Sequence, residues 1–250
     1  MRRVLLGIFV FSVFIGAVSL AAQTPNDILA RHEDAIGGKN VISQVKSISM
    51  ETTTHVGEND IPGTVVTLDG VASRTEMAIN GAKMVQCYTA KGGWMVNPMA
   101  GMADPTPMPD DQYQMGKNQI YVGGDLHDYA APGKKLELLN KDANTYTVKL
   151  TTKDNTESTY VFDAATYLVK SIARKGKFQN QDVIATTSLS DYRKTDIGLM
   201  VPYAISIDFG GQFSLSITVN KVEVNKPVDP DICAMPKASP QPVEGTATPN

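Results

Sequence analysis

The sequence has few of the residues that build catalytic and metal centres. Its 250 residues include only three histidines, His32, His55 and His127, and no two of them have the spacing that places two ligands on one helix face. It contains no Gly-x-Ser-x-Gly segment and no phosphate-binding glycine motif. These absences argue against a catalytic zinc site, a serine-hydrolase elbow and a nucleotide cofactor. A hydrolase whose carboxylates converge from two strands stays a minor alternative.

Basic residues are not in excess. The chain has 23 Lys and Arg against 26 Asp and Glu, a formal net charge of −3. Because affinity for nucleic acid depends on clustered Lys and Arg, we expect no nucleic-acid partner. With 42% hydrophobic and 20% charged residues, the chain can bury a sizeable core.

Long apolar runs are rare, and the N-terminus holds the main one. A short basic start, Met1-Arg2-Arg3, precedes an uncharged run over residues 4–20 that ends in Ser19-Leu20-Ala21-Ala22. This pattern is typical of a secretory signal peptide, and we predict one over residues 1–22. The alternative is a single membrane anchor, although about 17 apolar residues is the lower limit for a membrane-spanning helix. We therefore expect an exported protein without a lipidated N-terminus, since no Cys follows the run.

Cysteine is also scarce, because Cys87 and Cys233 are the only two in the chain. An exported chain can form disulfides, and closing so long a loop would stabilise the fold by a few kcal/mol. Both residues also have apolar neighbours, which is typical of cysteines that pack as small buried side chains. The sequence leaves both interpretations open.

What the sequence has in abundance is the pattern of short β-strands. From Ser47 onward, runs of alternating apolar and polar residues are separated by turn dipeptides such as Asp69-Gly70, Asn80-Gly81 and Gly210-Gly211. About a dozen strands are expected, in one large curved antiparallel sheet. Before them, Thr24-Pro25 can begin a helix with Ile28, Leu29 and Ile36 on one face, and a short helical turn follows.

Two segments interrupt this pattern. Residues 97–132 are rich in Pro, Met, Gly and Asp and are too long for an ordinary connection, so we predict a functional loop or lid with a helix around residues 117–129. Residues 237–250 contain several prolines and no aromatic residue, and we expect a disordered tail. One domain over residues 23–236 remains.

Five methionines lie in and beside the predicted lid. They are Met95, Met99, Met102, Met108 and Met115. Flexible, polarizable thioethers suit a surface that packs against varied apolar partners. The same side chains could bind Cu(I), a soft ion, and a copper-binding protein is therefore an alternative.

Several segments resemble exported proteins of the outer-membrane lipoprotein carrier superfamily, the LolA-like and LolB-like lipoprotein-sorting proteins. The segments are Ile36-Gly37-Gly38, Val45-Lys46-Ser47-Ile48, Ser73-Arg74-Thr75-Glu76-Met77, Gly92-Gly93-Trp94-Met95-Val96-Asn97-Pro98, Ser190-Asp191-Tyr192-Arg193, Val201-Pro202, and residues 222–229. The likeness spans about residues 24–236. The chain departs from the family at Cys233, where a bulky aromatic is common, and in the methionine-rich loop.

The resemblance implies a mainly β (α+β) fold, in which a single large curved antiparallel sheet forms an incomplete β-barrel with a helical lid. It implies a non-enzymatic periplasmic carrier without a cofactor that shields lipoprotein acyl chains or a similar lipid, with membrane-bound donor and acceptor proteins as partners. Arg74 matches a strand arginine that in carriers holds the lid through backbone hydrogen bonds, and a solvent-facing strand charge is the alternative. The residues predicted to bind ligand or form the lid are Ile28, Leu29, Ile36, Arg74, Trp94, Met95, Met99, Met102, Met108 and Met115. A non-enzymatic interaction or sensor module on the same sheet is the alternative function.

Overall fold

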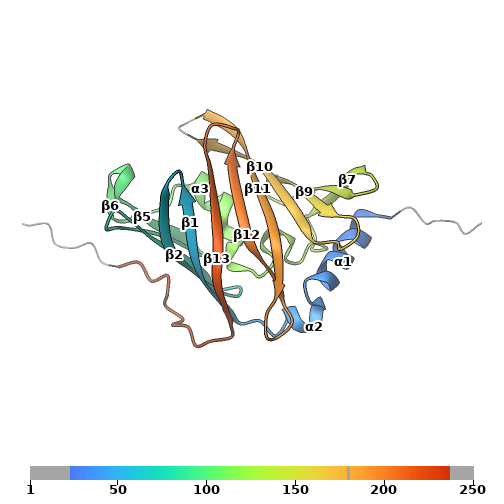
Figure 1. Cartoon of the computed structure of the whole chain (residues 1–250), viewed down its shortest axis with the longest axis horizontal. Coiled ribbons are helices and arrows are strands. Elements are labelled where there is room, and N and C mark those ends of the chain that lie inside the picture. Colours follow the sequence, from blue (N-terminus) through green and yellow to red (C-terminus); the bar gives the residue numbers. More distant parts are fainter. Residues whose placement is uncertain (1–22, 179–180, 237–250) are drawn as a thin grey trace, which may run out of the picture.

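One antiparallel sheet dominates the computed structural model, which describes residues 23–178 and 181–236. The predicted signal peptide (1–22) and tail (237–250) lie outside the described residues. Within them, thirteen strands form an open, strongly curved sheet in the order β6-β5-β4-β3-β2-β1-β13-β12-β11-β10-β9-β8-β7 (Figure 1). The strands are β1 (Ser47–Val56), β2 (Asn59–Leu68), β3 (Ala72–Ile79), β4 (Ala82–Thr89), β5 (Gly92–Asn97), β6 (Met102–Pro107), β7 (Lys135–Lys141), β8 (Thr145–Thr151), β9 (Glu157–Asp163), β10 (Val169–Phe178), β11 (Gln181–Lys194), β12 (Met200–Phe209) and β13 (Ser214–Val224). This confirms the predicted fold class.

The turn dipeptides set the strand boundaries as predicted. Asn80 and Gly81, with φ of 51° and 80°, separate β3 from β4. Gly210 and Gly211, with φ of 65° and 72°, separate β12 from β13. Asn80 and Gly81 form a two-residue hairpin turn, which requires positive φ at both positions and whose twist matches the strands. The β12–β13 loop is longer, residues 210–213, and begins with the two glycines.

The two faces of the sheet differ in polarity, most clearly along β12 and β13. Ile205 lies opposite Ile217, and both are half-buried on the concave face. Ser206 lies opposite Ser216, and both are exposed on the convex face. Because successive side chains of a strand point to opposite faces, this alternation gives the sheet an apolar concave side and a polar convex side.

Two short helices precede the sheet, α1 (Pro25–Ala35) and α2 (Gly38–Ile42). Thr24 caps α1, and its side chain and that of Asp27 satisfy each other's backbone N–H groups. Ile28 and Leu29 are fully buried against the concave side of β8 and β9, where they join Val148, Leu150 and Phe162 in one apolar cluster. The helix therefore covers one end of the concave face, as the sequence predicts.

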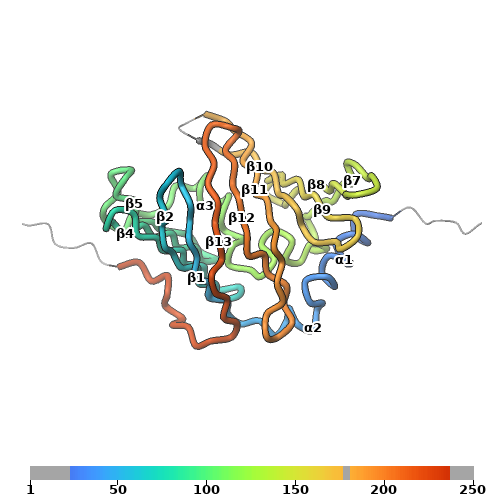
Figure 2. Tube along the Cα trace, in the orientation of Figure 1, coloured from blue at the N-terminus to red at the C-terminus, as the bar shows by residue number. Residues whose placement is uncertain are grey.

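The edge strands β6 and β7 are consecutive in the chain, and residues 108–134, here called the crossing segment, connect them across the concave face (Figure 2). Met108 N donates to Gly93 O in β5, Gly70 N in the β2–β3 turn donates to Ile120 O, and further along Leu126 joins the α1 cluster. The segment thus spans the sheet from one edge to the other.

The single helix predicted over residues 117–129 is wrong. The region instead contains α3 (Asp110–Gly116) and the 3-10 turns η2 (Lys117–Ile120) and η3 (Gly124–Leu126), and a further 3-10 turn, η1 (Pro98–Ala100), precedes β6. Gly123, Gly124 and Asp128 have φ of 92°, 57° and 51°, which a right-handed helix cannot contain. The predicted loop over residues 97–132 also contains a strand, β6, which pairs with β5.

Candidate functional site

A cavity of about 320 Å³ lies on the concave face beneath the crossing segment. Its apolar wall comes from β1, β10, β11, β12 and the residue before β12. The principal apolar side chains are Ile48, Met50, Ile172, Leu189, Leu199 and Val201. Ligand sites are commonly concave and mostly apolar with a few placed polar groups, and this cavity has that character.

The cover of the cavity consists of α1 and residues 121–126 of the crossing segment. His32 and Ile36 contribute from the helix side. Val122 N donates to the Asp69 carboxylate at 2.8 Å, which ties the cover to the β2–β3 turn. Of the residues predicted for the lid at this end of the chain, Ile36 lines the cavity and Ile28 and Leu29 do not. Their role in a lid stays a prediction.

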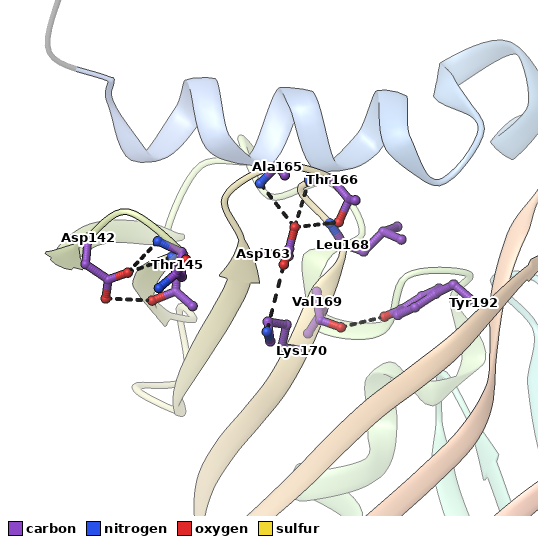
Figure 3. A network of polar contacts seen from close by, with 10 residues as sticks. Asp142, Thr145, Asp163, Ala165, Thr166, Leu168, Val169, Lys170 and Tyr192 are labelled. Atoms are coloured by element: carbon purple, nitrogen blue, oxygen red, sulfur yellow. Dashed lines mark hydrogen bonds and ion pairs between the residues drawn. The ribbon is translucent and has the colours of Figure 1, made fainter.

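On the sheet side of the cavity, a side-chain hydrogen bond joins β10 and β11. Val169 in β10 and Tyr192 in β11 both line the cavity, and the Tyr192 hydroxyl donates to Val169 O at 2.8 Å (Figure 3). Burial raises the pKa of Tyr192, and burial raises the pKa of Tyr160, another lining residue, to about 12. Both phenols therefore stay neutral at ordinary pH, and the wall adds no charge there.

A buried ion pair fastens the cover to the floor of the cavity. The Arg174 Nη2 atom in β10 donates to Asp125 Oδ2 at 2.5 Å, and Arg174 Nε donates to Ser158 Oγ at 2.9 Å. Asn118 Nδ2 donates to the other Asp125 oxygen at 2.7 Å. Asp125 is buried, so this pair joins the crossing segment to the sheet where water is scarce.

His32 of α1 lines the cavity on its helix side. The ring is buried, packs edge-on against Phe162, and its Nδ1 lies 2.9 Å from Tyr167 O. Desolvation lowers the pKa of His32, although the backbone hydrogen bond acts in the opposite direction. A neutral ring that donates from Nδ1 leaves Nε2 as an acceptor.

A second cavity of about 400 Å³ lies on the outer side of the cover, between α1 and residues 122–130. It shares His32, Ile36, Val122, Gly123 and Leu126 with the first cavity, so these residues form the partition between the two. Charged side chains, among them Glu33, Lys39 and Asp128, line the outer cavity. Displacing the partition would join a polar entrance to an apolar interior.

Arg74 and Trp94 lie on the convex face, away from this cavity. Thr67 lines the cavity and pairs with Ser73, so the next residue, Arg74, points to the opposite side. Arg74 Nη1 donates to Ile232 O at 2.7 Å, and Trp94 Nε1 donates to Cys233 O at 2.7 Å. Arg74 does bind backbone oxygen as the resemblance implies, but it holds residues 229–234, here called the C-terminal strap, and not the cover.

Cys233 of this strap meets Cys87 of β4. Cys87 and Cys233 are both buried free thiols in one cluster with Ala72, Val85 and Trp94. The hydrogen bond between the thiols raises the pKa of Cys87 and lowers the pKa of Cys233. Their position fits the interpretation as packed side chains, and the disulfide stays a prediction.

The five methionines do not form one lid. Met95 and Met108 are buried with Tyr88 and Ile120, and Met102 packs against them, at the β4–β5 end of the concave face. The other two, Met99 and Met115, are 71% and 42% exposed. In the described part of the chain none of the five lines the 320 Å³ cavity, whose methionines are Met50 and Met200. The predicted ligand contacts therefore find no support in this geometry, and the copper alternative stays a prediction.

The charged pair of the site, Arg174 and Asp125, is not among the residues predicted from the sequence. Arg174 shares the strand face of Ile172, so a charge falls on an otherwise apolar register, and this signal was available. Asp125 follows Gly123-Gly124 in an irregular segment, and no local pattern distinguishes it from a surface residue.

The arrangement is suited to binding. Across residues 23–178 and 181–236, no group of three or more His, Cys, Asp and Glu side chains could hold a metal ion. In the same ranges, none of the helices has the length and apolar character that a membrane crossing requires. The chemistry that the cavity offers is an apolar enclosure with one cation, Arg174, at its floor.

Comparison with known proteins shows a likeness of fold. No protein-family model and no curated protein matches the sequence. Among solved structures, a LolA superfamily protein from Nitrosomonas europaea aligns with a TM-score of 0.56 and 10% identity over 85% of this chain and 98% of that chain. A domain described as an outer membrane lipoprotein-sorting protein, from Vibrio parahaemolyticus, aligns with a TM-score of 0.55 and 8% identity over 82% and 95%. A DUF1329 family protein from Desulfovibrio piger aligns with a TM-score of 0.55 and 11% identity over 83% and 96%. The chain therefore has the fold that its sequence resemblance indicates.

Proposed function

We propose that the chain is a periplasmic carrier that binds an acyl chain of a lipoprotein or a similar lipid in the concave cavity and takes part in lipoprotein sorting without catalysis. The observation that carries the proposal is the mostly apolar cavity of about 320 Å³ that α1 and residues 121–126 partly cover. The likeness of fold to lipoprotein-sorting structures supports it. The predicted signal peptide supplies the route of export, and membrane-bound donor and acceptor proteins would be its partners.

The size of the cavity limits what it holds. Small-molecule sites range from about 300 to 1,000 Å³, and this cavity lies at the lower end of that range. Each methylene group that leaves water contributes about 0.8 kcal/mol. A single acyl chain in the cavity would therefore gain enough free energy for stable binding, whereas several chains would require displacement of the cover.

The direct test is mass spectrometry of lipid extracted from the full-length protein purified from the periplasm. We expect about one bound acyl chain per protein, since one chain fits the enclosed volume. The L189W variant fills the cavity, because Leu189 lines it. In its matched control, S190W, the new side chain lies one residue along β11 on the exposed convex face. L189W should lose the lipid while S190W retains it.

The interaction or sensor module is the competing function. A module would use the outer surface of the sheet and would carry no lipid, and L189W would leave it as active as S190W. Lipid-free wild-type protein that also fails to bind added fatty acid would refute the carrier proposal.

A further inference from the structure

Polarity is distributed unevenly along the cavity. Arg174, Tyr160 and Asp125 lie at one end, and Leu199, Val201 and Ile48 lie toward the other. Along β10, Arg174 follows Val169 by five residues, which corresponds to about 16 Å of extended strand. The cavity is therefore elongated, with its cation near one end and a mostly apolar lining over the rest, where Thr67, His32 and Tyr192 are among the polar side chains.

The hydrogen bonds of this polar end leave one set of donors free. Arg174 uses Nε for Ser158 and Nη2 for Asp125 and for the Tyr160 hydroxyl, at 3.2 Å in the last case. Both Asp125 carboxylate oxygens accept bonds, from Asn118 and from Arg174. Within the described residues the two Nη1 hydrogens of Arg174 have no partner, and this side chain is 31% exposed although it lies inside the fold.

Unpaired guanidinium N–H groups at the polar end of a mostly apolar cavity select a particular kind of ligand. Arginine cannot lose its proton in a protein, and its planar fork matches the geometry of a carboxylate. Hydrogen bonds from a guanidinium to a carboxylate are about twice as strong as those between neutral groups. An uncharged hydrocarbon would leave these donors desolvated and unpaired, which costs free energy.

We propose that the cavity takes a single-chain amphiphile with a carboxylate, a fatty acid, whose carboxylate binds the Nη1 edge of Arg174 while its chain extends toward Leu199 and Val201. The inference rests on the proposed lipid-binding function and assigns the chemical class of the ligand. It also gives the orientation, with the acid group at the polar end of the cavity.

The charges around Arg174 permit this. Asp125 balances the charge of Arg174, but Lys134 adds a second cation, because its Nζ donates to Asp125 O at 3.1 Å and also to His127 O. Asp128 acts on Lys134 from an exposed position at the surface. The charged side chains that line the cavity are Arg174 and Asp125, whereas Lys134 lines a separate cavity with Asp128 and Asp154. The preference for an incoming anion therefore rests on the unpaired Nη1 group of Arg174.

The test compares three ligands of one chain length: lauric acid, methyl laurate and dodecanol. At neutral pH the wild-type protein should bind lauric acid about tenfold or more tightly than methyl laurate, as a charge-assisted hydrogen bond predicts. Isothermal titration calorimetry or displacement of a fluorescent lipid measures the ratio. Equal affinities for all three would overturn this inference and leave the carrier proposal intact, whereas no binding of any of them would overturn both.

Two variants assign the preference to Arg174. In R174M the acid-to-ester ratio should fall to about one, since the donors are removed. The double variant R174M/D125N leaves no unpaired buried carboxylate and should give the same ratio if R174M alone fails to fold. R193M is the matched control, because it removes an exposed arginine that pairs with Asp191 outside the cavity, and it should retain the wild-type ratio. A tenfold preference that survives in either methionine variant would contradict the assignment.

Discussion

His32 illustrates how single residues set the conditions under which the fold is stable. The ring is buried between α1 and β9, packs against Phe162 and hydrogen-bonds Tyr167 O, so folding places it where a charged imidazole is disfavoured. The pKa of His32 therefore lies below the ordinary value of 6.5 in the folded protein. The unfolded chain takes up the proton more readily as the pH falls.

This difference predicts a stability change with a definite sign. The contribution of neutral, buried His32 to the free energy of unfolding is fully present above pH 6.5. It is lost as the pH falls below that value, with a slope of at most about 1.4 kcal/mol per pH unit. Urea denaturation at about pH 7.5 and about pH 5.5 measures it. H32N keeps a donor for Tyr167 O but does not titrate, so the slope that wild type shows should be reduced in H32N. An identical pH dependence in both proteins would exclude His32 as the source.

At the scale of the elements, the strands and their turns could be predicted because local rules decide them. Alternation gives each strand its faces, and Asn80-Gly81 can adopt the positive φ that its turn needs. The crossing segment obeys no such rule: its path depends on contacts with β5, the β2–β3 turn and β10, which are distant in sequence. Arg74 shows the same limit, because a strand arginine can be placed on a face only when the register is known.

The C-terminal strap gives a prediction at this scale. Arg74 holds Ile232 O and stacks over the Trp94 ring at 5.5 Å, and it also pairs with Glu76. R74L should lower the free energy of unfolding by about 1 to 3 kcal/mol, because a hydrogen bond to a charged group is lost.

Lipid affinity should be unchanged in R74L, since Arg74 lies on the face opposite the cavity. Denaturation and lipid titration on the same preparation separate the two effects. K83L, which removes the exposed partner of Glu76 on the same face, is the matched control and should change stability by less than about 1 kcal/mol. A large loss of lipid affinity in R74L alone would return Arg74 to the role of a lid residue.

The whole molecule is an open sheet whose two edges, β6 and β7, are consecutive in the chain. The connection between them has to reach from one edge to the other, and here it passes over the concave face, where it covers the cavity. The Pro, Met, Gly and Asp content of residues 97–132 indicates a long irregular connection. It does not show that the strands on either side lie at opposite edges of the sheet, because strand order follows from pairing between distant residues. The open arrangement also means that the cover can be displaced without breaking any strand pair of the sheet.

The ion pair between Arg174 on the floor of the cavity and Asp125 in the cover holds the cover closed. The D125N variant tests this role. The amide accepts a weaker hydrogen bond from Arg174, so the closed state should lose about 1 to 3 kcal/mol. We expect dissociation of bound lipid to be about fivefold or more faster in stopped-flow displacement, with the strand content by circular dichroism unchanged.

D154N is the matched control for D125N, because it weakens an ion pair between Lys117 of the same crossing segment and the β8–β9 turn, outside the cavity that Asp125 lines. Its dissociation rate should stay close to that of wild type, since an exposed pair contributes at most about 1 kcal/mol. Equal rates in D125N and wild type would mean that lipid leaves without release of residues 121–126. The lipid would then have to leave past His32 and Ile36, where the inner and outer cavities adjoin.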